Sequence, residues 1–126
     1  MTWLSSLPHQ IPFRAASAVT GRTDDTIEGK FLVTANDPLP FEAMIVEAMA
    51  QFGGGLAFRD RPGHGFLSGV DRCEVSRPLV AGEIVHLTVK MEAAFGGIFR
   101  FIGTGVVDGL EVVKGRFYLS EPPEAP

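Results

Sequence analysis

Apolar and polar residues alternate most clearly in the second half of the chain. In the segment VHLTVKM, positions 85, 87, 89 and 91 are apolar, while positions 86, 88 and 90 are polar. Successive side chains of a strand point to opposite faces, so this pattern predicts a strand with one buried face and one wet face. Four strand-like segments separated by turns follow position 65, at 66–77, 83–94, 98–107 and 110–120.

Turn residues separate these segments and indicate which strands are neighbours. Asp108 and Gly109 stand between the last two segments, and an Asp-Gly pair tolerates the positive backbone angles that a two-residue hairpin turn requires. Near the amino terminus, a polar turn at 21–25 joins two further strand-like segments, 15–22 and 26–34. We therefore expect one hairpin at each end of the chain.

The segment between these two groups has a different composition, FEAMIVEAMAQFGGGLAF, which is rich in alanine, methionine and glutamate. These residues favour helix, and Asp37 can cap a helix that begins between Asp37 and Phe41. The segment is apolar nearly all round, which predicts burial on several sides. Glycines at 53, 54 and 55 indicate either a close approach of the partner helix or of an acyl chain, or an early end of the helix.

A hairpin, a buried helix and four antiparallel strands predict an α+β fold in which a curved sheet wraps one long central helix. The chain has 126 residues and is 45% hydrophobic, which suits a single domain with its own core. We expect that domain to occupy residues 1–120. The end of the chain, EPPEAP, carries prolines and acids that cannot pair or pack, so we expect residues 121–126 to be a flexible tail.

Charge and cysteine content exclude several classes of function. The formal net charge is −4 and no lysine- or arginine-rich run occurs, which argues against a nucleic acid partner. Cys73 is the single cysteine, so we expect it to pack as a small apolar side chain, with no disulfide, metal or other cofactor. The first residues, MTWLSSLPHQ, lack a basic region followed by an apolar stretch. We therefore expect no membrane anchor and a cytoplasmic location.

Glu47 is the residue that points most directly to chemistry. It stands within MIVEAMA, where an unpaired buried carboxylate would cost several kcal/mol. Gln51 follows four residues later, on the same helix face. One interpretation is that Glu47 gives or takes a proton during catalysis. The alternative is that Glu47 pairs with an arginine such as Arg72 or Arg77 and only fixes the helix in place.

Four segments together resemble the β-hydroxyacyl-acyl carrier protein dehydratases. IVEAMAQFGGGLA resembles the Glu-Ala-Met-Ala-Gln helix motif of that family, and LPHQIPF resembles its amino-terminal Leu-Pro-His-Arg-x-Pro-Phe. FLSGVDRCEVSRPLVAGE resembles its Phe-x-Gly-Ile-Asp motif followed by Arg-Pro-Val-x-Pro-Gly-Asp. VVDGLEVVKGRFYL is similar to the closing hairpin of the family. The resemblance extends from Leu7 to Leu119.

The resemblance implies a hotdog fold and a homodimer or a trimer of dimers. It also implies an acyl thioester substrate, carried by acyl carrier protein or coenzyme A. Glu47 takes the position of the carboxylate that helps the β-hydroxyl group leave as water, and Gln51 supports the same helix face. Gly69 takes the position of the glycine in the Phe-x-Gly-Ile-Asp motif and is implied to contact substrate.

The chain departs from the family just before the helix. The dehydratases carry a His-Phe-Pro-Gly-x-Pro-x-x-Pro-Gly loop there, whose histidine is the base and whose last glycine contacts the thioester carbonyl. This chain has ANDPLPFEA, without the histidine and with Glu42 in place of the glycine. Amides at the helix start, at Phe41, Glu42 and Ala43, can still bind a carbonyl oxygen.

His9 is the best substitute for the missing base, since LPH precedes the first strand and could reach the substrate of either subunit. Alternatively, His9 caps a turn or lines a subunit interface. We expect His64, in RPGHG, to lie in an exposed loop, and His86 to lie on the wet face of its strand without a role.

The first hypothesis for function is a dehydratase-like protein acting on (3R)-hydroxyacyl groups bound to acyl carrier protein. The second is a thioesterase of the same fold, and the third is a degenerate acyl-binding subunit whose partner supplies the histidine. A basic patch that receives the carrier could form from four arginines, or these could be scattered and solvated: Arg59, Arg61, Arg72 and Arg77.

Overall fold

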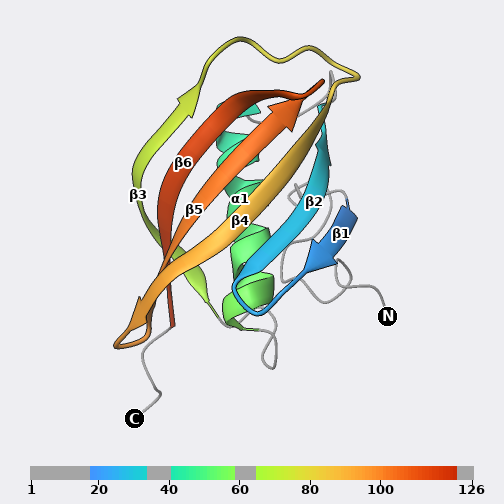
Figure 1. Cartoon of the computed structure of the whole chain (residues 1–126). Coiled ribbons are helices and arrows are strands. Elements are labelled where there is room, and N and C mark those ends of the chain that lie inside the picture. The colour runs from blue at the N-terminus through green and yellow to red at the C-terminus, as the bar shows by residue number, and fades with distance from the viewer. Residues whose placement is uncertain (1–17, 34–40, 59–64, 122–126) are drawn as a thin grey trace.

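One helix packs against a six-stranded antiparallel sheet in the computed structural model, which describes residues 18–33, 41–58 and 65–121. The sheet has the order β1-β2-β4-β5-β6-β3 and curves around the helix α1, which lies behind it in Figure 1. The predicted α+β arrangement is therefore confirmed. The elements are β1 (Ala18–Arg22), β2 (Thr26–Leu32), α1 (Phe41–Ala57), β3 (Phe66–Val75), β4 (Ile84–Phe95), β5 (Ile98–Val107) and β6 (Leu110–Ser120).

The turns form where the sequence predicts them. Asp108 and Gly109 have positive φ angles of 50° and 80°, and Val107 pairs with Leu110 directly across the turn. Positive φ angles of this kind match the twist of the flanking strands, which is why the Asp-Gly pair closes a tight hairpin. The hairpin of β1 and β2 is also confirmed, through pairs that include Arg22 with Ile27.

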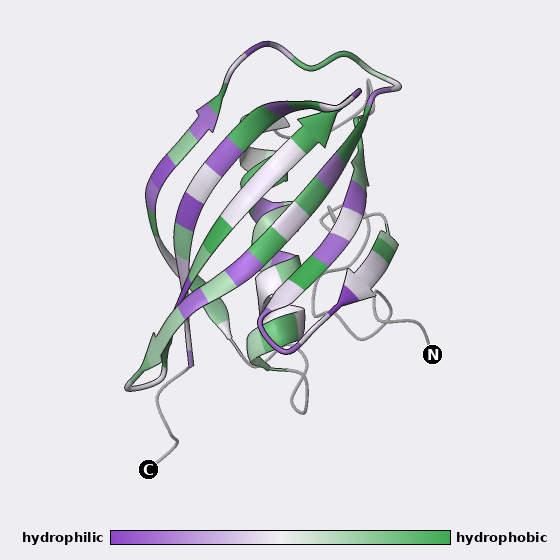
Figure 2. Cartoon of the chain, in the orientation of Figure 1, coloured by the Kyte–Doolittle hydropathy of each residue, from purple (hydrophilic) through white to green (hydrophobic). Residues whose placement is uncertain are grey.

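The alternation in β4 separates a core face from a solvent face. Val85, Leu87 and Val89 are fully or almost fully buried, whereas His86 and Lys90 are exposed. Figure 2 shows the same alternation as green and purple bands along the strands. The inner faces of the strands therefore form the core together with α1.

The glycines at 53–55 do not end the helix, which continues to Ala57, so the expectation of an early end is wrong. A Cβ at Gly53 would lie 3.2 Å from the ring of Phe117 and 3.3 Å from Leu119, so this side of the helix packs tightly on β6. The Arg22 guanidinium donates a hydrogen bond of 3.3 Å from Nη1 to the carbonyl oxygen of Gly55. No helix of the described ranges is long and apolar enough to cross a membrane.

The closest approach of α1 to the sheet depends on glycines in three strands. A Cβ at Gly103 of β5 would collide with the thioether of Met49, and one at Gly29 of β2 would collide with the ring of Phe52. At Gly115 of β6, a Cβ would lie 3.4 Å from Cε of Met49. These strands therefore leave room for the large side chains of α1, and the packing fixes how the helix is rotated.

We expect Gly103→Ala to destabilise the protein by about 1–3 kcal/mol, because the new methyl group overpacks the space that Met49 fills. Gly21→Ala is the matched control, since its Cβ would meet only the flexible Glu28 carboxylate, at 3.4 Å, and should change stability by less than about 0.5 kcal/mol. Urea unfolding of the two variants measures the difference. Equal free energies of unfolding for Gly103→Ala and Gly21→Ala would contradict this expectation, because the helix could then move away from the sheet at no cost.

An ion pair organises the connection between β3 and β4. Arg77 donates from Nη1 and Nη2 to the two carboxylate oxygens of Glu83, at 2.9 and 2.8 Å, and the Val80 amide donates to Glu83 at 2.7 Å. The hydrogen bonds from Arg77 and Val80 lower the pKa of Glu83 to about 2. The ionised Glu83 carboxylate thus holds Arg77 and the Val80 backbone together across the loop between β3 and β4.

The contribution of Glu83 to stability should follow its ionisation. Because its folded-state pKa lies below the ordinary value of 4.5, the contribution is complete above that value and is lost as the pH falls through about 2. We expect the stability advantage of the wild type over Glu83→Gln to be constant from neutral pH down to about 4.5 and to shrink between that pH and about 2. Urea midpoints measured along this pH series test the expectation, and an advantage that is constant with pH would contradict it.

Candidate functional site

The helix α1 has one face on the sheet and another that points away from it. Met49 and Phe52 contact strand glycines, so they mark the sheet side. At 100° per residue, Glu47 and Gly54 lie almost opposite these two residues on the helix. A Cβ added at Gly54 would meet no atom of residues 18–33, 41–58 or 65–121 within 4 Å. Among these residues, the helix face with Glu47 and Gly54 is therefore open at Gly54.

Glu47 and Gln51 form a polar pair on this apolar helix. The Gln51 amide donates a hydrogen bond from Nε2 to Oε1 of Glu47, with a length of 3.4 Å. Gln51 is the one polar or charged side chain among the fully buried residues of the described ranges, with an exposure of 4%, and Glu47 is half-buried. A buried amide that donates to a carboxylate oxygen restricts where the carboxylate can point.

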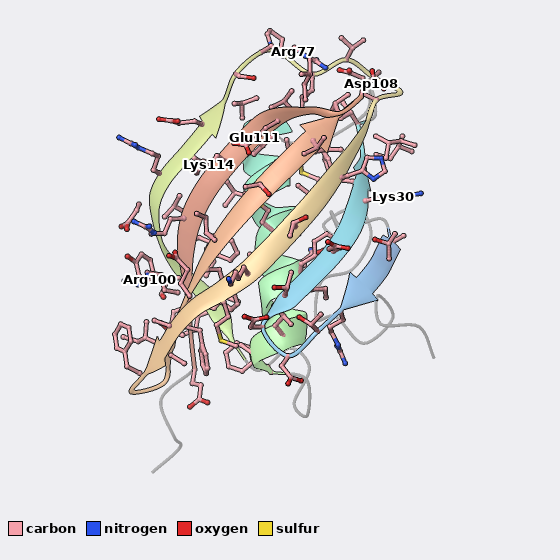
Figure 3. The ribbon with its side chains drawn as sticks, viewed as in Figure 1. Lys30, Arg77, Arg100, Asp108, Glu111 and Lys114 are labelled. Carbon is pink, nitrogen blue, oxygen red and sulfur yellow. The ribbon has the colours of Figure 1, made fainter. Side chains whose placement is uncertain are left out.

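The arginines named as alternative partners of Glu47 form ion pairs elsewhere. Arg77 binds Glu83 at 2.8 Å, and Nε of Arg72 lies 3.5 Å from Glu74. Both pairs sit on or beside β3, and Arg77 lies near the end of the molecule where β3 leads into β4 (Figure 3). The structure therefore gives these arginines partners other than Glu47.

The helix α1 begins within the range that the sequence predicts, at Phe41. The helix begins at Phe41, so Phe41, Glu42 and Ala43 form its first turn, whose amides have no acceptor within the helix. The side chains of these three residues lie outside the described part of the chain. His9 and His64 also lie outside it, and their roles stay predictions.

The remaining site residues lie on the sheet. Gly69 of β3 pairs with Tyr118 of β6, and a Cβ there would lie 3.5 Å from the Tyr118 ring. Gly69 therefore contacts β6, and no described contact joins it to the Glu47–Gln51 pair on α1. His86 is exposed on β4, and the half-buried side chain of Cys73 packs against the core, both as expected. No group of three histidine, cysteine or acidic residues suited to a metal ion occurs in 18–33, 41–58 or 65–121.

An ionic cluster on the outer face of the sheet was not predicted. Glu92 of β4 lies 3.1 Å from Nε of Arg116 and 3.8 Å from Nε of Arg100, and the Tyr118 hydroxyl donates to Asp71 at 2.7 Å. The hydrogen bond to Asp71 raises the pKa of Tyr118. The polar positions of the strands are visible in the sequence, but their pairing depends on strand order and register.

Comparison with known proteins assigns the chain to a family. No family model matches it. A 3-hydroxyacyl-acyl-carrier-protein dehydratase FabZ from Salmonella arizonae is 33% identical over 143 residues, covering 97% of this chain and 91% of the relative. The chain belongs to the FabZ dehydratase family. The family resemblance predicted from the sequence is thus confirmed.

Solved structures confirm the hotdog fold of this FabZ family member. The dehydratase heterocomplex ApeI:P from Xenorhabdus doucetiae matches with a TM-score of 0.81 at 18% identity, covering 98% of this chain and 93% of that one. A candidate thioesterase related to phenylacetic acid degradation, from Ralstonia eutropha, matches with a TM-score of 0.70 at 14% identity, covering 89% and 92%. At these identities the likeness establishes the fold alone.

Proposed function

We propose that the chain is a dehydratase of FabZ type, which removes water from (3R)-hydroxyacyl groups carried as thioesters by acyl carrier protein. Family membership supports the substrate class. The observation that carries the proposal is the Glu47 carboxyl group, half-buried on the helix face away from the sheet and hydrogen-bonded by the buried Gln51 amide. A proton donor held in apolar surroundings is what the loss of a β-hydroxyl group requires.

The reaction divides into three tasks, and residues of this chain are proposed for each. A base takes the α-proton, and the electron pair left on the α-carbon forms the new double bond. The β-hydroxyl group takes a proton from the carboxylic acid form of Glu47, which becomes a carboxylate, and leaves as water. Backbone amides of residues 41–43 stabilise negative charge on the thioester carbonyl oxygen, because the start of a helix carries a partial positive charge.

His9 is the proposed base, since the family histidine before the helix is absent. Of the three histidines, only His86 lies in the part of the chain that the structure describes. It is exposed on β4, on the side of the sheet opposite the core and the helix, so it cannot reach Glu47. That position favours a second candidate function, in which the chain is a subunit whose partner supplies the base. ApeI:P, of which one chain has this fold, is itself a dehydratase heterocomplex.

A dimer is the proposed assembly, with β3 as the joining strand. β3 is one edge of the sheet and exposes Phe66, Leu67 and Val70, with exposures of 50, 37 and 45%. An edge strand presents unpaired amides and carbonyls, and an apolar edge of this length is normally covered by another strand. β1, at the other edge, has half the length, with 5 residues against 10. A second copy that adds its own β3 would cover these groups.

We expect Glu47→Gln to lower the rate of dehydration of a 3-hydroxyacyl-carrier substrate by about 10²–10⁴-fold, because the amide cannot donate the proton with the same ease. Mass spectrometry of the carrier follows the loss of water. Glu111→Gln, on the exposed side of β6, is the matched control and should retain the wild-type rate. A folded Glu47→Gln protein with full activity would remove Glu47 from the mechanism.

His9→Ala, tested in the same assay, should lose activity to a similar degree if His9 is the base. Release of free acid by the wild type would instead indicate a thioesterase. An absence of any reaction, restored by a second hotdog chain, would indicate the heteromeric subunit.

Val70→Lys should convert the dimer to a monomer, because a lysine on an edge strand opposes pairing with a second strand. Sedimentation velocity gives the mass. Leu110→Lys is the control, since Leu110 is 71% exposed at the opposite end of the sheet, beside the Asp-Gly turn, and its replacement should leave the dimer intact. A Val70→Lys protein that keeps the dimeric mass would place the interface elsewhere.

A further inference from the structure

Gly54 is a glycine in the interior of α1 for which the described part of the chain gives no packing reason. Its neighbour Gly53 has one, since a Cβ there would lie 3.2 Å from the Phe117 ring and 3.3 Å from Leu119. A Cβ at Gly54 would meet no atom of residues 18–33, 41–58 or 65–121 within 4 Å. Glycine destabilises a helix interior relative to alanine, so a glycine without such a contact indicates that the space beside it has another use.

Gly54 lies on the same face of α1 as the proposed proton donor, Glu47. The two residues are seven positions apart, which is about 20° short of two full turns and about 10 Å along the helix axis. The amides of residues 41–43, proposed to bind the thioester carbonyl oxygen, lie at the start of the helix, before Glu47. A 3-hydroxyacyl group held by these groups therefore directs its hydrocarbon end along the helix toward Gly54.

Two apolar side chains of β3 stand on the helix side of the sheet. Leu67 pairs with Leu119 and Val70 pairs with Phe117, and residues directly opposite each other point to the same side of a sheet. Leu119 and Phe117 belong to the core, yet Leu67 and Val70 are 37 and 45% exposed, so α1 does not cover them. A second β3 would pair with the backbone edge of this strand and leave these side chains on the helix side.

The rotation of α1 turns Gly54 toward this strand. Phe52 points to Gly29 of β2, and Gly53 points to β6, which lies beside β3 in the sheet. Each residue advances about 100° around the helix, so Gly54 comes next, on the side of α1 nearer β3 and turned away from the sheet. The open face of α1 and the exposed core-side residues of β3 therefore border the same flank of the helix.

We propose that Gly54 determines how long an acyl chain the site accepts, because the hydrocarbon chain passes over it between α1 and β3. The proposal rests on the proposed function, which supplies the 3-hydroxyacyl group, and it adds the determinant of chain length. A glycine at this position leaves the path of the distal methylene groups clear. Leu67 and Val70 contact the chain from the side of the sheet, as apolar walls of a ligand site do.

A hydroxyacyl chain suits this face better than the helix of a second copy does. Gly54 alone would also allow a second helix to approach closely. Such a helix would, however, remove water from the carboxyl group of Glu47 on the same face, which disfavours apolar packing there. A hydroxyacyl group brings a hydroxyl group for Glu47 and apolar carbons for Gly54.

The first measurement tests whether the space at Gly54 is open. We expect Gly54→Ala to raise the midpoint of thermal unfolding by about 2–5 °C, because alanine favours helix and its methyl group meets no neighbour. Gly53→Ala is the matched control in the same helix and should raise the midpoint less, or lower it, because its methyl group meets Phe117. A lower midpoint for Gly54→Ala would show that protein atoms fill the space and would overturn the proposal.

The second measurement compares kcat/KM for dehydration of 3-hydroxytetradecanoyl and 3-hydroxyhexanoyl groups on acyl carrier protein. We expect Gly54→Leu to lower the ratio of the long-chain to the short-chain value at least about tenfold, because the leucine side chain occupies the path of the distal carbons. Gly21→Leu is the control and should keep the wild-type ratio, since Gly21 pairs with the exposed Glu28 on the solvent side of the sheet. An unchanged ratio in Gly54→Leu would overturn the proposal.

Binding of unreactive probes separates this proposal from the proposed function. Isothermal titration calorimetry with tetradecanoyl- and hexanoyl-pantetheine amides should show that Gly54→Leu raises the dissociation constant of the long probe about tenfold relative to the short one. If the wild type dehydrates no substrate, the proposed function fails and this ratio decides the role of Gly54. An unchanged ratio, with a Gly54→Leu protein that sediments as a monomer, would assign the space to a second copy and overturn the proposal.

Discussion

The close contact between α1 and the glycines of the sheet is the constraint on which the other features depend. Met49 and Phe52 occupy space that side chains at Gly103 and Gly29 would fill, so the helix can sit on the sheet in one rotational setting. That setting turns Glu47 and Gly54 to the opposite side. A carboxylate on the other face would be driven into the core against Phe101 and Phe117, where burial without a partner is prohibitive.

The same packing explains why a helix that is apolar nearly all round can still hold a polar pair. Its sheet side stabilises the fold, and its free side holds a polar pair in which Gln51 donates to Glu47. Since Gln51 is buried, water does not compete freely for its amide. The carboxyl group proposed for catalysis thus lies on the helix that packs against the sheet, although the family's histidine loop before that helix is missing.

The elements and turns could be predicted from the sequence because they depend on local patterns. The period of two in β4, the Asp-Gly turn at 108–109 and the helix-forming composition of 41–57 each decide a structure within a few residues. The Glu47–Gln51 contact followed from four-residue spacing for the same reason. The persistence of the helix through Gly53 was not predictable, because it depends on packing against Phe117 of a distant strand.

The side-chain contacts on the outer face of the sheet could not be predicted from local sequence patterns. Glu92, Arg100 and Arg116 belong to three strands, and their contact depends on the order of the strands and on a register shift in β4 between Met91 and Ala93. Neither follows from the periodicity of one strand. The same limit applies to the pairing of Arg77 with Glu83, which required the shape of the loop between β3 and β4 rather than its composition.

The central claim is that the substrate lies against the helix face that carries Glu47. A crystal structure of the protein with a non-hydrolysable 3-hydroxyacyl-pantetheine amide tests it most directly. The account predicts that the β-hydroxyl oxygen lies within hydrogen-bond distance, about 3 Å, of the Glu47 carboxylate. A bound acyl group elsewhere, with Glu47 facing away from its β-carbon, would contradict the account.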